Sequence, residues 1–329
     1  MIRIGLIGAG HFGAVHARAL ARIPDAVLAA VCAGDLPSAA AFAAQYGGTP
    51  RDDWRALLDD PAIDVVVIAT PHALHTEITI AALNAGKHVL LEKPMATTPE
   101  DCRTIEAAAH LSAGLLTIGH VMHFFRPLLA AREIIASGEL GRPVAGRSAL
   151  IKLWMESNRR PWHLRPETGG GMLMTAGIHA LDQLVWLMEG RVAGVSALVG
   201  TFSHVQEADD GALLLLRFDD GRIGQVTSLG YRDGAVINGV EIVCERGVVA
   251  VDLDRGVRVG QGATWQDVPD SFEPNGQDEA VHREWQAFLA AIATGGPSPI
   301  DAGYGRHIVE IIDAAHQASR ERREVAIPE

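Results

Sequence analysis

The first third of the chain alternates short apolar runs with longer stretches of helical periodicity. The apolar runs, each rich in Val, Ile or Leu, lie at residues 3–7, 27–32, 64–69, 88–91 and 115–119. Runs that are short and apolar throughout predict strands buried on both faces, as in a parallel sheet. Between them, breakers and caps predict helices at residues 12–23, 38–46, 76–84 and from Thr98 onward. This alternation predicts a doubly wound α/β domain.

The rhythm changes after Pro127. Helical patterns at residues 128–137 and 172–188 flank a strand-like run at 144–153, and further strand-like runs follow at 211–218, 223–229, 239–244 and 247–253. Successive strands without intervening helices predict an α+β region with a large, mainly antiparallel sheet. Two amphipathic helices, at residues 278–294 and 303–320, close the chain. We therefore predict two domains, 1–122 and 123–329, with the last helices able to pack back on the first domain.

Composition narrows the class of protein. Of the 329 residues, 48% are hydrophobic and 21% charged, as in ordered globular proteins. No apolar run approaches the ~18–20 residues needed to cross a bilayer, and the N-terminal segment lacks the pattern of a signal peptide. The net charge of −12 argues against a nucleic-acid groove. Three widely spaced cysteines indicate neither a disulfide framework nor a metal site. We expect a cytoplasmic protein without nucleic-acid or membrane partners.

A glycine-rich turn follows the first predicted strand and opens the first predicted helix. Its pattern is Gly8-x-Gly10-x-x-Gly13, with His11 and Phe12 between the last two glycines. The first glycine allows the tight turn, the second lets the backbone approach a pyrophosphate, and the third lets the helix pack against the strand. The pattern predicts a dinucleotide site at the helix N-terminus. The alternative is an ordinary glycine-rich turn.

The residue that contacts the adenosine ribose is expected about 20 positions after the glycine turn. Ala33, Gly34 and Asp35 stand there. The Asp35 carboxylate can accept hydrogen bonds from a ribose diol and repel a 2′-phosphate, whereas Ala33 carries no charge. No Arg or Lys nearby favours the phosphate. The segment therefore predicts NAD or NADP, with NAD favoured. The alternative is that Asp35 only caps the next helix.

Three further motifs resemble one known family. They are residues 69–75 (Ala-Thr-Pro-His-Ala-Leu-His), residues 85–94 ending in Glu92-Lys93-Pro94, and the triple glycine 169–171 that leads to His179. In this order they resemble the glucose–fructose oxidoreductase/inositol dehydrogenase/MocA (Gfo/Idh/MocA) family, over essentially the whole chain. The resemblance implies an N-terminal Rossmann domain and a C-terminal α/β domain with an open sheet. It also implies NAD(P)-dependent oxidation of a secondary alcohol, often on a sugar or cyclitol, or the reverse reduction.

The resemblance extends the predicted cofactor site to the segments after two later strands. His75 matches the family's nicotinamide-side position. The full set of predicted cofactor-binding residues is Gly8, Gly10, His11, Phe12, Gly13, Ala33, Asp35, Ala69, Thr70, Pro71, His75, Glu92 and Lys93.

Lys93 is the first predicted catalytic residue. The chain has only three lysines, and we expect the other two, Lys87 and Lys152, on the surface. Hydride transfer from an alcohol requires the hydroxyl proton to leave. A lysine at the carboxyl edge of a parallel sheet, where such folds bind ligands, can stabilise the alkoxide or relay the proton. For Glu92 two readings stay open: it orients Lys93 or the nicotinamide ribose, or it forms a structural salt bridge.

His179 is the second predicted catalytic residue, because an imidazole that titrates near neutrality suits an alcohol proton. Thr175, His179 and Asp182 share one face of the predicted helix. The alternative for His179 is a packing role. Where the family carries an aspartate, this chain has Thr175, which can hold a substrate hydroxyl but cannot ionise. We expect a less basic His179 than an acidic neighbour would give. Asp182 is considered as the residue that orients His179 in place of the aspartate, although it lies on the far side of His179.

Polar residues before the triple glycine are candidates for the substrate. Arg159, Arg160, Trp162, His163 and Arg165 suit a polyol or a carboxylated ring; the alternative is a mobile loop with solvated charges. His123 stands where the family often has arginine. The predicted substrate-binding residues are His123, Arg160, Trp162, His163, Thr175 and His179. The pairs His72/His75 and His120/His123 lack further ligands, so we predict no metal.

The leading hypothesis is a dehydrogenase or reductase that uses Lys93 and His179 to handle the proton. The alternatives are a cofactor-binding regulator and an NAD-retaining glycosidase on the same scaffold. The strand-rich second half can present a sheet face to another subunit, which predicts a homodimer or homotetramer.

Overall fold

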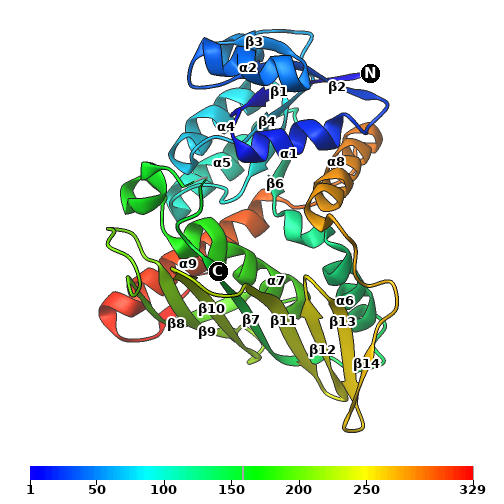
Figure 1. The fold of residues 1–329 in the computed structure, drawn as a ribbon, viewed down its shortest axis with the longest axis vertical. Helices are drawn as coiled ribbons and strands as arrows, with labels where there is room; N and C mark the ends of the chain where they lie inside the picture. The colour runs from blue at the N-terminus through cyan, green and yellow to red at the C-terminus, as the bar shows by residue number, and fades with distance from the viewer. Residues whose placement is uncertain (158, 329) are drawn as a thin grey trace. The chain divides into compact units, whose positions relative to one another are not determined.

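The computed structural model describes residues 1–157 and 159–328 (Figure 1). Contacts divide the chain into two compact units, Met1–Val121 with Gln277–Val309, and Met122–Gly276 with Glu310–Glu329. Each unit is described by itself. The predicted folding domains, 1–122 and 123–329, stay a prediction, because these units group residues by contact alone.

A six-stranded parallel sheet forms the centre of the first unit, with strand order β3-β2-β1-β4-β5-β6. Its strands are β1 (Ile2–Ile7), β2 (Ala26–Cys32), β3 (Thr49–Arg51), β4 (Val65–Ile68), β5 (His88–Glu92) and β6 (Leu116–Gly119). The order reverses between β1 and β4, and ligands of such sheets bind at the carboxyl ends of the strands beside this reversal. The predicted doubly wound parallel sheet is confirmed.

Helices connect the strands of this unit. They are α1 (His11–Leu20), α2 (Leu36–Tyr46), α3 (Arg55–Leu58), α4 (His75–Asn84) and α5 (Pro99–Leu111), followed much later by α8 (Gly276–Thr294) and the first half of α9 (Ala302–Glu321). Helix α1 contacts α2, and α4 contacts α5. Right-handed crossovers on either side of the reversal place these two pairs on opposite faces of the sheet. The sheet is thus buried on both faces, as the apolar runs predict.

Lys87 lies in the first unit and is only 7% exposed. Its Nζ donates hydrogen bonds to the backbone oxygens of Asp60 and Ile63, each at 2.8 Å. The predicted surface position of Lys87 is therefore wrong. Its ammonium group satisfies carbonyl groups of the turn before β4, which the sequence does not reveal because the partners are backbone atoms 24 and 27 residues away.

The second unit contains a nine-stranded sheet with strand order β14-β13-β12-β11-β7-β10-β9-β8-β15. The strands are β7 (Pro143–Leu153), β8 (Val192–Gly200), β9 (Gly211–Phe218), β10 (Ile223–Tyr231), β11 (Ile237–Cys244), β12 (Gly247–Asp252), β13 (Gly256–Gln261), β14 (Thr264–Asp267) and β15 (Val325–Ala326). Only β7 and β10 pair in parallel; the other neighbours pair antiparallel. The predicted large, mainly antiparallel sheet is confirmed.

Two helices pack on one face of this sheet (Figure 1). Helix α7 (Ile178–Met188) contacts β7, β10 and β11, and α6 (Arg126–Ala136) contacts β12 and β13. A Cβ atom on Gly146 of β7 would lie 2.5 Å from Leu184 of α7, so glycine lets the helix approach the strand closely. The packing fixes the position of the segment that enters α7, where two predicted site residues lie.

That segment differs from the predicted continuous helix at residues 172–188. Residues Leu173–Gly177 form a turn of π-helix, and α7 begins at Ile178. A Cβ on Gly177 would lie 2.1 Å from Ser228 Oγ on β10, and Gly171 has a φ of +105°. Wide turns of this kind occur often at functional sites.

In the described part of the chain, residues 1–157 and 159–328, no helix combines the length and apolar character needed to span a bilayer.

Candidate active site

The glycine turn after β1 has the geometry of a phosphate-binding loop. Gly8 has a φ of +112°, and a Cβ there would lie 2.4 Å from the backbone oxygen of Ala69. A Cβ on Gly13 would lie 2.2 Å from the backbone oxygen of Gly8, whereas one on Gly10 would meet no atom within 4 Å. Gly10 is the N-cap of α1, whose first turn has no acidic residue. The helix therefore leaves backbone N–H groups facing open space, which fits a pyrophosphate.

Asp35, the predicted ribose contact, is the N-cap of α2. Its Oδ1 accepts a hydrogen bond from the Ser38 N–H at 2.7 Å, and this bond lowers the pKa of the exposed carboxyl group. The capping role considered in the sequence analysis is thus present. The contact of the Asp35 carboxylate with a ribose stays a prediction, as does the cofactor contact of Ala33, which directly follows β2.

His75 fastens together the segments that follow β4 and β5. Its Nδ1 lies 2.8 Å from the backbone oxygen of Pro94 and its Nε2 lies 3.1 Å from that of Thr70. Burial lowers the pKa of His75, against the opposite effect of these carbonyl groups and of Glu92. The structure thus brings the predicted segments 69–71 and 92–94 side by side at the carboxyl edge of the sheet. The Lys93–Pro94 peptide bond is cis.

Glu92 ends β5 and is buried next to His16 of α1. Its Oε1 accepts a hydrogen bond from His16 Nε2 at 2.9 Å, and His16 Nδ1 accepts one from Trp285 Nε1 of α8 at 3.0 Å. Of the two readings of Glu92, the structure thus contains the structural contact, and the partner is His16 of the same unit. Its orienting role toward Lys93 or a ribose stays a prediction.

Glu284 completes this group, which we name the His16 cluster: His16, Glu92 and Glu284. Among the described residues, it is the group of His, Cys, Asp and Glu side chains whose spacing would accommodate a metal ion, with one polar atom from each residue within 4.8 Å of the others. The histidine pairs considered from the sequence do not form it. The sequence analysis missed His16 and Glu284 because each lies in an amphipathic helix among other polar residues, and only tertiary packing buries them.

In the second unit, the triple glycine leads into the π-helix with Thr175 buried and His179 half-buried in the first turn of α7. Asp209 holds the start of this segment: its Oδ2 accepts a hydrogen bond from the Leu173 N–H at 2.8 Å, and its backbone oxygen accepts one from the Met172 N–H at 2.9 Å. Burial raises the pKa of Asp209 to about 7. Asp209 is a positioning residue that the sequence analysis missed.

Asp182 and His123 form a buried pair. Asp182 Oδ1 lies 2.8 Å from His123 Nε2, and the His123 ring stacks on Trp186 with centroids 4.4 Å apart. Asp182 therefore orients His123 directly. Its proposed effect on His179, and the substrate contact of His123, stay predictions.

The segment before the triple glycine folds into two short 3-10 helices, Pro161–Leu164 and Pro166–Thr168. His163 is buried; its Nδ1 accepts a hydrogen bond from the Arg160 N–H at 2.9 Å, and its ring stacks on Trp162. Arg159 donates to the Trp154 backbone oxygen at 2.7 Å, and burial lowers its pKa. The alternative of solvated charges thus fails for Arg159, while Arg160 and Arg165 are exposed.

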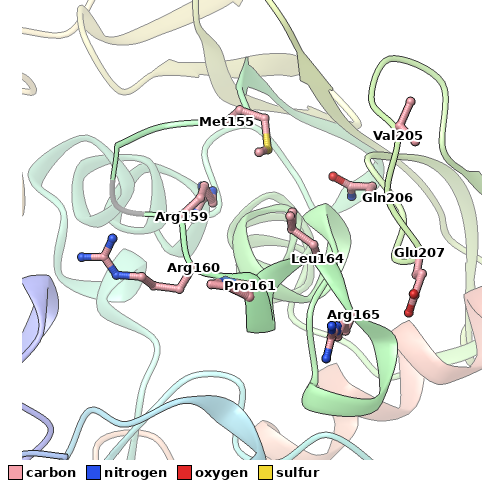
Figure 2. Close-up of a pocket in the computed structure, with 9 residues that line it drawn as sticks. All are labelled: Met155, Arg159, Arg160, Pro161, Leu164, Arg165, Val205, Gln206 and Glu207. Carbon is pink, nitrogen blue, oxygen red and sulfur yellow. The ribbon is translucent and has the colours of Figure 1, made fainter.

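A pocket of about 380 Å³ opens beside this segment. Its lining consists of Met155, Arg159, Arg160, Pro161, Leu164, Arg165, Val205, Gln206 and Glu207. In Figure 2 the Arg160 side chain extends away from Val205 and Gln206 on the opposite wall. Of the predicted substrate residues, Arg160 alone lines this pocket.

Two family profiles match the chain. The oxidoreductase family with an NAD-binding Rossmann fold (GFO_IDH_MocA) matches residues 2–120, and the GFO/IDH/MocA C-terminal domain matches residues 128–250.

Curated relatives and solved structures agree with these matches. Inositol 2-dehydrogenase 2 of Saccharopolyspora erythraea is 31% identical over 89% of this chain and 86% of that protein. The 1-carboxy-3-chloro-3,4-dihydroxycyclo hexa-1,5-diene dehydrogenase of Comamonas testosteroni is 34% identical over 70% of this chain, which spans only 58% of that protein. A structure of levoglucosan dehydrogenase in complex with NADH superposes with a TM-score of 0.91 at 26% identity, over 100% of this chain and 99% of that chain.

Proposed function

Because this chain belongs to the Gfo/Idh/MocA family of NAD-binding oxidoreductases, we propose that it transfers a hydride between NAD and a secondary alcohol or ketone of a sugar, cyclitol or related cyclic diol. The relatives support this substrate class by their names, one for inositol, one for a dihydroxycyclohexadiene and one for levoglucosan. The family assignment makes the chain an oxidoreductase; the alcohol itself is our proposal.

The observation that carries the proposal is the arrangement at the carboxyl edge of the parallel sheet. Lys93 directly follows β5, and Gly8 directly follows β1. The residue after Lys93, Pro94, is linked by hydrogen bonds of the His75 ring to the segment after β4. Strands β1, β4 and β5 are neighbours in the sheet. The phosphate loop and the lysine therefore lie at the same edge, where doubly wound sheets bind dinucleotides.

The proposed roles follow from the chemistry of each side chain. Bound NAD supplies the hydride acceptor. The Lys93 ammonium stabilises negative charge on the alcohol oxygen. His179 accepts the hydroxyl proton, and the Thr175 hydroxyl holds a neighbouring substrate hydroxyl. Lys93 belongs to the first unit and the other two residues to the second, so their convergence is part of the proposal.

Lys93→Met tests the proposal. We expect turnover to fall by about 10²–10⁴, because the group that stabilises the alkoxide is removed, while NADH binding measured by fluorescence is retained. Lys152→Met is the matched control, because Lys152 lies in β7 and not at the carboxyl edge of the parallel sheet. Its Nζ forms an ion pair with Glu156 Oε1 at 2.9 Å. Unchanged turnover in Lys93→Met would refute the role.

Substrates are found by a screen of inositols, anhydrosugars and cyclic dihydrodiols with NAD and NADP, followed by the absorbance of reduced nicotinamide. We expect activity with NAD on at least one cyclic diol. Tight NAD retention with turnover but no net NADH would instead support the glycosidase alternative, and cofactor binding without any turnover would support the regulator.

The cytoplasmic location is likewise proposed, supported by three buried cysteines without a disulfide among them.

A further inference from the structure

The His16 cluster places two carboxyl groups and an imidazole together in the interior of the first unit. His16, Glu92 and Glu284 are 0%, 6% and 2% exposed and come from α1, β5 and α8. One polar atom from each lies within 4.8 Å of the others. Two buried carboxyl groups at this separation cannot both ionise without strong repulsion unless a cation or a proton intervenes.

The hydrogen-bond directions around His16 decide its protonation. The Trp285 indole N–H can only donate, so His16 Nδ1 must accept and carries no proton. The single ring proton is then on Nε2, which donates to Glu92 Oε1 at 2.9 Å. His16 is therefore a neutral imidazole, and it does not supply the positive charge that would balance both carboxylates.

Glu284 differs from Glu92 in its hydrogen bonding. Neither Glu284 oxygen has a hydrogen-bond partner among residues 1–157 and 159–328, and both are buried. Burial, and then the negative charge of Glu92, raise the pKa of Glu284 well above its ordinary value. Glu92, by contrast, accepts an N–H from His16. A proton in the cluster is therefore best held by Glu284, because Glu92 keeps its hydrogen bond from His16.

We propose that Glu284 is a positioning residue: held as a neutral carboxylic acid beside Glu92, which His16 holds on the other side, it leaves a single negative charge in the cluster, immediately before Lys93. The inference rests on the proposed role of Lys93. The charge of Glu92 already acts beyond the cluster, since it raises the pKa of His75 while Lys93 lowers it. Glu284 acts on the reaction through Glu92, without touching the reacting atoms.

A divalent cation is the other way to balance two carboxylates. A histidine ligand offers a lone pair, usually from a neutral ring whose second nitrogen donates a proton to its neighbour. Here the second nitrogen, Nδ1, accepts from Trp285, so metal binding through Nε2 would require a fully deprotonated imidazole. The geometry therefore favours a proton, and metal binding becomes an outcome of the test.

Infrared spectroscopy of the full chain with NADH bound tests the protonation directly, whatever the substrate is. The comparison is made in an Asp209→Asn background, because the pKa of Asp209 is about 7 and that carboxyl group would give a band of its own at pH 7. In this background we expect the C=O stretch of a protonated carboxyl group at pH 7, shifted in D₂O, which disappears in Glu284→Gln. Glu279→Gln is the matched control on the same helix, because Arg22 lies 2.9 Å away and lowers the pKa of Glu279, so it is ionised; this variant keeps the band. An unchanged band in Glu284→Gln, or a stoichiometric divalent metal lost from that variant, overturns the proposal.

The pH dependence of kcat tests the positioning role. Glu284→Leu replaces the neutral acid beside Glu92 by an apolar side chain, so we expect kcat to fall about tenfold and its acid limb to move to higher pH, with the Kd for NADH within about twofold. Glu284→Gln keeps a neutral polar group of similar shape beside Glu92 and restores both. Equal losses in the two variants, or an unshifted limb in Glu284→Leu, contradict the role. If Glu284→Leu does not fold, the infrared comparison decides alone.

Discussion

Three lysines in one chain illustrate how environment sets the role of a side chain. Lys87 donates to two backbone oxygens, Lys152 pairs with Glu156, and Lys93 stands at the carboxyl edge of the parallel sheet. The rarity of lysine in the sequence does not by itself distinguish the three. What distinguishes Lys93 is the strand that ends before it, because strand ends in such sheets border the ligand.

At Asp209 the structure predicts a pH-dependent stability. Its pKa is raised from 3.8 to about 7 by burial, so the folded protein holds a proton that the unfolded chain releases between these values. The stabilisation is complete below pH 3.8 and is lost as the pH rises to about 7, by an upper bound of about 4 kcal/mol. In Asp209→Asn, which still accepts from Leu173, we expect the melting temperature to change much less from pH 4 to 7. If the melting temperatures of the two proteins change by the same amount between pH 4 and pH 7, the assignment to Asp209 is wrong.

Some residues of the site could be predicted from the sequence and others could not. The glycines, Asp35, His75 and Lys93 follow strands whose apolar runs are visible, so their place at the sheet edge can be inferred. His16, Glu284 and Asp209 act through burial by segments remote in the chain. A glutamate such as Glu284 looks like any polar position of an amphipathic helix until α8 packs over it.

The glycine turn and α1 together form the element that is expected to hold the cofactor. A Cβ on Gly10 enters open space, whereas one on Gly13 collides with the Gly8 backbone oxygen. We therefore expect Gly10→Ala to keep its melting temperature but weaken NADH binding at least about tenfold, equivalent to about 1.4 kcal/mol. Gly13→Ala should lose stability as well. Fluorescence titration and thermal melts measure both; unaltered NADH affinity in Gly10→Ala would argue against phosphate binding at this turn.

Elements with a strong pattern were predicted, and elements with a weak one were not. The buried parallel strands have uninterrupted apolar runs, and β9 alternates buried and exposed positions along its length. Strand β3 contains Pro50 at a sheet edge, and β14 is exposed at every position, so neither has such a pattern. The π-helix before α7 could not be predicted from the sequence, because apolar residues continue through it. The change of pitch is visible only in the structure, where Gly177 packs closely against Ser228.

At the scale of the whole molecule, the outer face of the nine-stranded sheet carries exposed apolar side chains. The register pairs Leu198 with Leu213, and Leu215 with Gln225, on the face opposite α7. Leu198, Leu215 and Ile223 are 65%, 62% and 60% exposed. A face with this many exposed apolar side chains is typical of a protein–protein interface. Packing of this face against the same face of a second copy would give a dimer with two-fold symmetry.

We propose that this face forms the interface of a homodimer or homotetramer, and we expect Leu215→Glu to weaken that assembly, because the new carboxylates would lie against apolar side chains. Light scattering during size-exclusion chromatography measures the mass. Leu111→Glu on α5 is the matched control, since Leu111 is 89% exposed in the first unit, and should leave the mass unchanged. A monomeric wild-type protein would show that the face has another role.

We propose that Lys93 and His179, which belong to different units, act on one alcohol beside the nicotinamide ring. A crystal structure with NADH and a substrate found in the screen tests it most directly. We predict that Lys93 Nζ and a His179 ring nitrogen both lie within hydrogen-bond reach of the reacting oxygen, roughly 2.6–3.2 Å or through one water. Either group far from that oxygen, or directed away from nicotinamide C4, contradicts the account.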